Sequence, residues 1–508
     1  MTYVWIALGA LGLLALWDIC QKKHAILRNF PILGHFRYLL ESIGPELRQY
    51  IVTDNDSERP FNRDQRRWIY AVSKNQSPYF GFGTDNDLEN AQDYLIIKHN
   101  VFPVPTPKPD SPDFDPSFSL PCAKILGGFR ERKKAFRPKS VVNVSAMSFG
   151  SLSSAAVEAI NRGCKEAGCL HNTGEGAASP HHLKGGDLIW QIGTGYFGCR
   201  NDDGTFSLER LLETCEQHSQ IKALEIKLSQ GAKAGLGGMV LAAKVTPEIA
   251  KIRGIPAYQN CFSPSSHSAF NDADSMLDWI EMLADKTGLP VGIKSAVGEL
   301  DFWEQLARQI DQTKRAVDFI TIDGGEGGSG AAPRAFADHV SLPFRHGFSR
   351  VYRLLAEHGL HHKIVFNGAG KLGFPETALF AFGIGADMIS VAREAMISIG
   401  CIQAQRCHTG HCPAGVATQN RWLMRGLDPT SKSARCANYI TKLRAEILQL
   451  SHTCGALHPA LVTPDHFEIL EGPYDSQSIR SVFNYREGDA IPSAGDIASI
   501  TELMNAKS

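Results

Sequence analysis

The stretch VDFITIDGGEGGSG, residues 317–330, decides the fold of this chain. It opens with a mostly apolar run, VDFITI, and passes at once into an eight-residue loop in which five residues are glycine. A short apolar run of this kind is typical of a strand buried on both faces of a parallel sheet. Glycines after such a strand let the backbone approach a flat or anionic ligand, whereas a flexible surface turn is the simpler alternative. Because the loop directly follows a buried strand, we interpret it as part of a binding site.

The same pattern recurs on both sides of this stretch. Further strands are predicted at residues 141–147, 170–173, 188–192, 223–228, 291–294, 364–367 and 388–392. Helices are predicted between several of them, at residues 152–167, 207–218, 273–287, 301–314, 351–358 and 375–382. Repeated strand–helix units predict a parallel sheet covered on both faces, and their number fits a closed (β/α)8 TIM barrel of about 250 residues. We therefore expect residues 140–426 to form an α/β barrel domain.

A glycine motif late in this series allows two interpretations. Residues 368–373 match G-x-G-x-x-G after a strand, and Asp387 lies about twenty residues further on, as in dinucleotide-binding folds. That fingerprint belongs in the first unit of a nucleotide-binding half, however. In a barrel, the loops after the last two strands commonly form a phosphate site. We therefore predict a barrel phosphate site in loops 367–370 and 383–387.

Three cysteines are gathered in CIQAQRCHTGHCPAGVATQ, residues 401–419. Cys401, Cys407 and Cys412 are separated by five and then four residues, so three thiolates could surround one inorganic centre. Clustered cysteines in a reducing compartment indicate a metal or iron–sulfur site, and three ligands suggest a cluster with one corner not held by cysteine. Three buried, inert thiols are the alternative, and the spacing alone does not decide between them.

Several of these segments carry a family resemblance. They are NTGEG (172–176), QGAKAGLGG (230–238), KVTPEIAKIR (244–253), DGGEGGSGAAP (323–333) and the cysteine segment. In this order they resemble the flavin domain of glutamate synthase, over roughly residues 141–420. With its apolar start, the chain is identified as a member of the FMN-binding glutamate synthase family. The resemblance implies FMN at the mouth of the barrel and a [3Fe-4S] cluster on Cys401, Cys407 and Cys412.

The resemblance also assigns residues to FMN, all near predicted strand ends. They are Met147, Ser148, Lys294, Gly327, Gly328, Gly368, Gly370, Gly385 and Arg393. Lys294 would lie at the pyrimidine edge of the flavin, although it could instead pair with an aspartate in the core. Gly368, Gly370 and Gly385 would hold the phosphate. Arg393 would add charge there, or it could cap a helix.

The substrate positions of the family match Glu175, Lys233 and Arg253. The implied reaction reduces 2-iminoglutarate, formed from 2-oxoglutarate and ammonia, to L-glutamate, with Glu175 or a water supplying protons. A dicarboxylate needs cations, and Arg grips a carboxylate with two hydrogen bonds. A structural Glu–Lys pair and a surface Arg are the plainer alternatives.

Two departures from the family's loop sequence leave the identity of the substrate undecided. Leu236 and Met239 stand where the family has Glu and Gln, so a polar substrate contact is lost. A membrane-tethered flavin oxidoreductase acting on another substrate or electron carrier is therefore an alternative. A barrel that has lost catalysis and serves as a membrane-bound scaffold is a further one.

The two ends of the chain complete the expected organisation. Residues 1–20 are almost entirely apolar and just long enough to cross a bilayer, and the basic residues Lys22, Lys23 and Arg28 after them favour a cytoplasmic body. A signal peptide and a buried or interfacial helix are the alternatives to this single-pass anchor. Residues 21–139 are expected to form an arm and linker that pack on the barrel, and residues 427–508 a helical extension and tail.

Overall composition limits the partners. The net charge of −1 provides no basic field for nucleic acid. The 12 cysteines are scattered apart from the trio, which favours a reducing compartment over a disulfide scaffold. No NAD(P)H domain or ferredoxin-type run is evident in the sequence, so we expect electrons from a separate donor and ammonia that is free or supplied by another protein.

Overall fold

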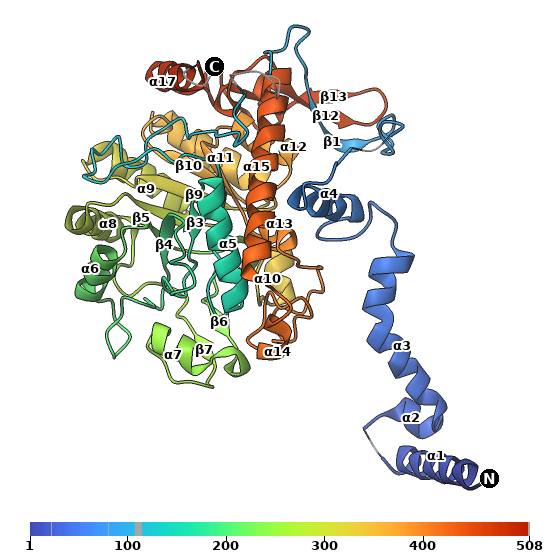
Figure 1. The fold of residues 1–508 in the computed structure, drawn as a ribbon. Coiled ribbons are helices and arrows are strands. Elements are labelled where there is room, and N and C mark those ends of the chain that lie inside the picture. The colour runs from blue at the N-terminus through green and yellow to red at the C-terminus, as the bar shows by residue number, and fades with distance from the viewer. Residues whose placement is uncertain (22, 80, 107–113, 506–508) are drawn as a thin grey trace. The chain divides into compact units, whose positions relative to one another are not determined.

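The structure is a computed structural model that describes residues 1–21, 23–79, 81–106 and 114–505 (Figure 1). The chain divides into two compact units, Met1–Trp68 and Ile69–Ser508. The larger unit contains a barrel and the candidate site. The smaller one contains the apolar N-terminal helices.

Within the larger unit, eight parallel strands of the described chain close into a barrel. They follow one another around it in chain order, and the last pairs with the first through Ile389 and Val142. The strands are β2 (Val142–Val144), β3 (His171–Asn172), β4 (Leu188–Ile192), β5 (Ile221–Lys227), β8 (Val291–Ser295), β9 (Phe319–Asp323), β10 (Val365–Ala369) and β11 (Met388–Val391). The predicted (β/α)8 TIM barrel is confirmed, and the burial of nearly every strand residue explains the apolar runs.

Helices cover the outside of the barrel (Figure 1). They are α5 (Ser154–Ala167), α6 (Leu208–Gln217), α8 (Ala273–Thr287), α9 (Asp301–Gln312), α11 (Phe344–Glu357), α12 (Pro375–Gly383), α13 (Arg393–Ser398) and α15 (Pro429–Thr453). Two short helices, α10 (Arg334–His339) after β9 and α14 (Arg421–Met424) after the cysteine segment, belong to the connections between these elements. Helix α5 shows why these ends fall where they do. The Ser153 side chain accepts from the N–H of Ala156 at its start, and Gly168 adopts the left-handed conformation at its end.

A long insertion separates strands β5 and β8. It contains the 3-10 turns η2 (Gly231–Lys233) and η3 (Ala242–Lys244), the hairpin β6 (Met239–Val240) and β7 (Cys261–Phe262), and helix α7 (Pro247–Arg253). Because it begins at the carboxyl end of β5, this insertion lies at the end of the barrel where chemistry is expected.

Polar side chains form a connected layer inside the barrel. Glu225 Oε1 accepts hydrogen bonds from Asn172 Nδ2 (2.8 Å) and Gln191 Nε2 (2.6 Å). Its Oε2 accepts from Thr321 Oγ1 (2.7 Å), which in turn accepts from Asn367 Nδ2 (3.0 Å). All five side chains are buried. Since a buried polar group without partners is costly, this satisfied network fixes five strands relative to one another.

The smaller unit is built from helices α1 (Thr2–Cys20), α2 (Ala25–Asn29) and α3 (Leu33–Leu47), followed by the π-helix η1 (Arg48–Val52). Helix α1 is apolar throughout except for Asp18, which is fully buried. Its carboxylate accepts from the N–H of Ile32 (2.9 Å) and pairs with His35 Nε2 (2.9 Å). The length and composition of α1 are suited to crossing a membrane. Since length and composition are the evidence for it, the membrane anchor stays a prediction.

Segments far apart in the sequence meet near the C-terminus. Strands β1 (Gln92–Ile97), β12 (Phe467–Glu471) and β13 (Ser476–Ser478) form an antiparallel sheet. Helix α4 (Arg63–Ser73) precedes it in the chain, and the turns η4 (Pro459–Leu461) and η5 (Pro464–His466) and the helices α16 (Ile479–Val482) and α17 (Ala494–Asn505) complete the tail. The expected tail is therefore more regular than its sequence indicated.

The amino end of the barrel is closed by residues 120–139, here called the bottom segment. Its backbone folds back on itself at Leu126 and Phe136, and Cys122 and Leu126 pack into a core cluster with Phe319 and Met388. An apolar plug of this kind keeps water out of the barrel interior.

A buried ion pair holds the bottom segment in place. Lys124 Nζ lies 2.8 Å from Asp387 Oδ2 and also donates to the carbonyls of His361 (2.6 Å) and Ile364 (2.9 Å). Burial raises the pKa of the Asp387 carboxyl, and the Lys124 ammonium opposes that rise. All three donors of the ammonium are thus used.

We expect Lys124→Ala to lower the free energy of unfolding by about 3–5 kcal/mol, because it leaves a buried carboxyl without its cation. Urea unfolding measures this loss. The control is Lys98→Ala, since Lys98 and Glu468 form an exposed pair with 42% and 37% of their side-chain surfaces accessible. That variant should lose less than about 1 kcal/mol. Equal losses in the two variants would contradict the assigned role of Lys124.

Candidate active site at the carboxyl ends of the strands

The loops after β9 and β10 pack backbone against backbone. The N–H of Gly324 donates to the carbonyl of Ala369 (2.8 Å). A Cβ on Gly370, whose φ is +126°, would lie 3.1 Å from the Gly324 nitrogen. Neither position has room for a side chain, which is why the sequence is glycine there. We call Gly324, Gly327, Gly328 and Gly370 the glycine cradle.

Two cations border the glycine cradle. Lys294 Nζ, at the end of β8, lies 3.5 Å from Asp323 Oδ2, and both side chains are buried. Lys294 therefore pairs with an aspartate, as the alternative interpretation of this residue proposed. Its contact with the flavin edge stays a prediction. Arg393 donates to the Glu326 carbonyl, and a Cβ on Gly328 would meet the Arg393 side chain at 2.7 Å. The cradle thus presents backbone and positive charge to one region.

The other two glycines predicted to bind the phosphate, Gly368 and Gly385, lie in different places in the structure. Gly368 lies within β10, and a Cβ there would meet the side chains of Phe344 and Leu372, so its missing side chain serves helix packing. Gly385 lies before β11, at the amino end of the barrel, where a Cβ would collide with the Tyr352 ring. The assignment of loop 383–387 and Gly385 to the phosphate site is therefore corrected, because that loop leads into its strand rather than out of it.

A group of four charged residues lies at the ends of β3 and β5 and in the insertion. We call Glu175, Lys227, Lys233 and Arg253 the charge cluster. Lys227 Nζ lies 3.0 Å from Glu175 Oε1. Burial raises the pKa of Glu175, but Lys227, then Lys233 and Arg253, more than offset this, and the pKa falls to about 2. Burial and the neighbouring Lys227 lower the pKa of Lys233 to about 8.

Arg253 is held at the end of α7 by several contacts. Its Nη2 donates to the carbonyl of Phe149 (3.0 Å), and its guanidinium lies over the Phe197 ring at 5.1 Å. A Cβ on Gly176 would lie 2.8 Å from Nη2, so a glycine makes room for it. The Nε of Arg253 is buried and has no hydrogen-bond partner among the described residues. A buried guanidinium with an unused donor is suited to an anionic ligand.

Met147 and Ser148 follow β2 and contact the same region. The carbonyl of Met147 accepts from His182 Nε2 (3.1 Å), and burial lowers the pKa of His182 to about 4, so this ring is neutral. A Cβ on Gly174, with φ +66°, would lie 2.8 Å from the Ser148 nitrogen. The predicted flavin-facing residues of β2 therefore pack against the loop that carries Glu175.

The loop after β5 joins the two halves of the site. Gln230 Nε2 donates to the Gly328 carbonyl (2.8 Å), and the N–H of Gly231 donates to Asp323 Oδ2 (3.0 Å). Two residues later, Lys233 belongs to the charge cluster. The glycine cradle and the charge cluster are therefore parts of one site.

The sequence analysis missed Lys227, and it assigned no individual role to Gln230 and Asp323, although both lie in loops that it singled out. A signal for the first was present, because Glu225 and Lys227 lie two residues apart in an otherwise apolar strand. Charges at that spacing face the same side of a strand and are rarely buried unless paired.

Two of the three cysteines lie together beside the site. Lys244 Nζ donates to the carbonyls of Cys407 (3.3 Å) and Ser151 (2.7 Å), and burial and the nearby Cys412 raise the pKa of Cys407. The Cys401 thiol accepts from the N–H of Gln403 (3.5 Å). In the part of the chain that the structure describes, no group of three or more His, Cys, Asp or Glu side chains is arranged to hold a metal ion. The iron–sulfur site therefore remains a prediction.

Comparison with known proteins decides the family. A family model described as the conserved region in glutamate synthase matches residues 123–456. The chain belongs to the glutamate synthase family. It is accordingly an oxidoreductase of the type that acts on CH–NH2 groups.

Individual relatives differ in how much of their length is matched. The glutamate synthase large subunit-like protein YerD of Bacillus subtilis is 38% identical, over 88% of this chain and 90% of that protein. An archaeal glutamate synthase [NADPH] of Methanocaldococcus jannaschii is 32% identical over 62% of this chain and 59% of its own. The chain thus spans about three fifths of that second relative. A solved flavocytochrome b2 double mutant with pyruvate bound matches 90% of each chain at 14% identity, with a TM-score of 0.42.

The depressed pKa of Glu175 predicts a pH effect on stability. The pKa of this carboxyl is about 2 in the folded protein and near 4.5 in the unfolded chain. Its ionised form therefore stabilises the fold above pH 4.5, and this stabilisation is lost as the pH falls toward 2. Between pH 5 and pH 3, the wild type should lose about 2 kcal/mol more unfolding free energy than Glu175→Gln. Urea unfolding at each pH checks this. The exposed Glu209→Gln control should follow the wild type, and parallel curves for all three proteins would contradict the prediction.

Proposed function

We propose that this protein is an FMN-dependent, iron–sulfur oxidoreductase that reduces 2-iminoglutarate, formed from 2-oxoglutarate and ammonia, to L-glutamate. Membership of the glutamate synthase family supports the reaction class. The observation that carries the proposal is the buried charge cluster at the strand ends, joined through Gln230 and Gly231 to the glycine cradle.

The glycine cradle and its cations fit FMN. Glycine backbone without side chains can approach a flat ring or a phosphate, and Arg393 lies against Gly328. Lys294 would stabilise negative charge at the flavin edge, and Met147 and Ser148 would lie beside the ring. When bound there, FMN supplies the two-electron reduction.

The charge cluster fits a dicarboxylate. Arg253 has an unused buried donor, and Lys233 adds a second positive charge. With a pKa of about 2, Glu175 is ionised at neutral pH and suits the role of acceptor for an imine or ammonium N–H. It is a poor proton donor at that pH, so we assign proton donation to Lys233, whose pKa of about 8 keeps it mostly protonated at pH 7.

Cys401, Cys407 and Cys412 are proposed to hold a [3Fe-4S] cluster. Thiolates are the ligands of such clusters, and Lys244 joins Cys407 to Ser151 in the loop after β2, close to the proposed flavin site. Electrons would reach the site from a separate donor. Helix α1, with a mean hydropathy of 1.8, would tether the cytoplasmic body to the membrane as a single-pass anchor.

A second candidate substrate is favoured by Met239. This residue follows Gly238, whose Cβ would lie 2.5 Å from Glu175 Oε1, so the chain passes directly beside the charge cluster at a position where an apolar residue replaces the family's Gln. The loss of that polar residue suits a 2-oxo acid with a less polar side chain, such as 2-oxobutyrate, better than 2-oxoglutarate. Relative rates on the two acids distinguish them.

The proposal is tested by incubating dithionite-reduced protein with 2-oxoglutarate and ammonia and measuring L-glutamate. The affinity for 2-oxoglutarate should fall as the pH rises through about 8, because Lys233 then loses its charge. Lys233→Ala should bind it at least about tenfold more weakly at pH 7.

The matched variant is Lys233→Arg, which stays charged and should keep its affinity up to about pH 9.5. If it supports little turnover, proton donation by Lys233 is upheld as well. Failure of the reduced wild type to form any amino acid from either 2-oxo acid would refute the proposed reaction.

Replacing Cys407 by Ser should abolish the iron–sulfur absorbance and electron paramagnetic resonance signal of anaerobically purified protein, since one thiolate ligand is lost. Cys454→Ser serves as the control, because Cys454 is a buried thiol at the end of α15. An unchanged iron content in Cys407→Ser would show that the ligand assignment is wrong.

A further inference from the structure

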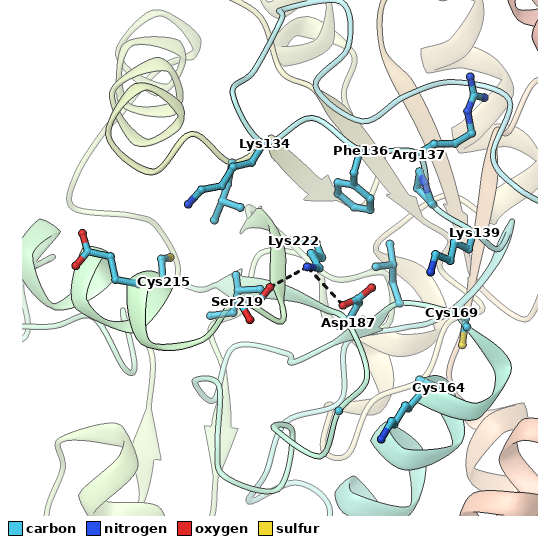
Figure 2. A pocket seen from close by; sticks show the side chains of 18 residues that line it. Lys134, Phe136, Arg137, Lys139, Cys164, Cys169, Asp187, Cys215, Ser219 and Lys222 are labelled. Atoms are coloured by element: carbon cyan, nitrogen blue, oxygen red, sulfur yellow. Dashed lines mark hydrogen bonds and ion pairs between the residues drawn. The ribbon is translucent and has the colours of Figure 1, made fainter.

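A cavity lies at the other end of the barrel from the candidate active site. Its volume is about 900 Å³, and it lies between the bottom segment, the amino ends of β3, β4 and β5, and the carboxyl ends of α5 and α6 (Figure 2). Leu170, Asp187 and Ile221 mark the three strand ends. The volume is in the range that encloses a small organic molecule.

The lining carries more positive than negative charge. Its cationic residues are Lys134, Arg137, Lys139, Lys165 and Lys222, and its carboxylates are Asp187 and Glu216. The Cys164 and Cys215 thiols of the lining add no negative charge, since burial raises the pKa of both groups, that of Cys215 to about 12. The cavity is therefore electropositive at neutral pH.

Two of the five cations already have partners. Lys222 donates to the carbonyl of Ser219 (2.9 Å) and lies 3.8 Å from Asp187, as Figure 2 shows. Arg137 donates to the Cys122 carbonyl (2.7 Å) and to Ser499 Oγ (2.9 Å). These two side chains are parts of the wall.

The other three cations, Lys134, Lys139 and Lys165, have no hydrogen-bond acceptor or ion-pair partner among the described residues. They come from separate segments, the bottom segment and α5, and surround one space. Room for Lys165 is provided by Gly185, where a Cβ would lie 2.8 Å from the Lys165 Cδ.

Apolar side chains also line the cavity. Phe136, Leu170, Ile221 and Leu289 contribute their side chains to it. Lys134, Lys139 and Lys165 are exposed to solvent, and Phe136 is the partly exposed apolar side chain among them. These three lysines differ from scattered surface lysines because they surround one concave space, in which the anionic groups of a bound molecule can pair with several cations at once.

We propose that this cavity binds a small organic anion that carries at least two negative charges, as phosphate or carboxylate, on an apolar or aromatic body. The site is independent of the proposed catalytic function, since it lies at the opposite end of the barrel.

Isothermal titration calorimetry of the full-length protein, with 2-oxoglutarate present in excess, tests the proposal. The probes are ATP, which carries phosphates, and phenylsuccinate, which carries two carboxylates. At least one should bind with one-to-one stoichiometry and more weakly at higher salt. The Lys134→Ala, Lys139→Ala and Lys165→Ala triple variant should bind that probe at least about tenfold more weakly.

The matched control is the triple variant Lys251→Ala, Lys286→Ala and Lys314→Ala, which removes the same charge from exposed positions outside the cavity. It should bind the probe as the wild type does. If the first triple variant fails to fold, the double variant Lys139→Ala and Lys165→Ala should still weaken binding. Binding of neither probe, or equal weakening in cavity and control variants, would overturn the proposal.

Discussion

The closure of the sheet, in which β11 pairs in parallel with β2, is the constraint on which the rest of the structure depends. Because the ring is closed, eight strands end in the same two places, and loops more than two hundred residues apart in the chain become neighbours. The Glu225 network inside the ring fixes five strands relative to one another. Small differences in strand position would otherwise displace every loop at the mouth.

The two ends of the ring are chemically distinct. At the carboxyl ends, an ionised carboxylate and three cations are buried together beside glycine backbone, an arrangement that stays favourable because the charges compensate one another. At the amino ends, the Lys124–Asp387 pair and an apolar plug close the barrel. The electropositive cavity lies next to that plug. The proposed redox site and the proposed anion site thus share no residues.

Much of the barrel was predictable from local pattern. The predicted strands at residues 188–192 and 291–294 coincide with β4 and β8 almost residue for residue, because strands buried on both faces are mostly apolar. Helix α11 begins at Phe344, well before the predicted residue 351, directly after Pro343, a residue that suits the start of a helix. Strands β12 and β13 were not expected, since pairing of β12 with β1 joins residues hundreds of positions apart.

The sequence by itself determined the residue types of the site: glycines where backbones touch, Glu175, Lys233 and Arg253 for charge, and clustered cysteines. It also determined the family, because those segments keep their order along the chain. The tertiary structure alone decided which end of the barrel each loop occupies, and so it removed Gly385 from the predicted phosphate site and placed Lys227 beside Glu175 at the mouth. The physical reason is that a local pattern fixes burial and backbone conformation, whereas the pKa of a carboxylate or an ammonium depends on which distant charges the closed ring brings within a few ångströms.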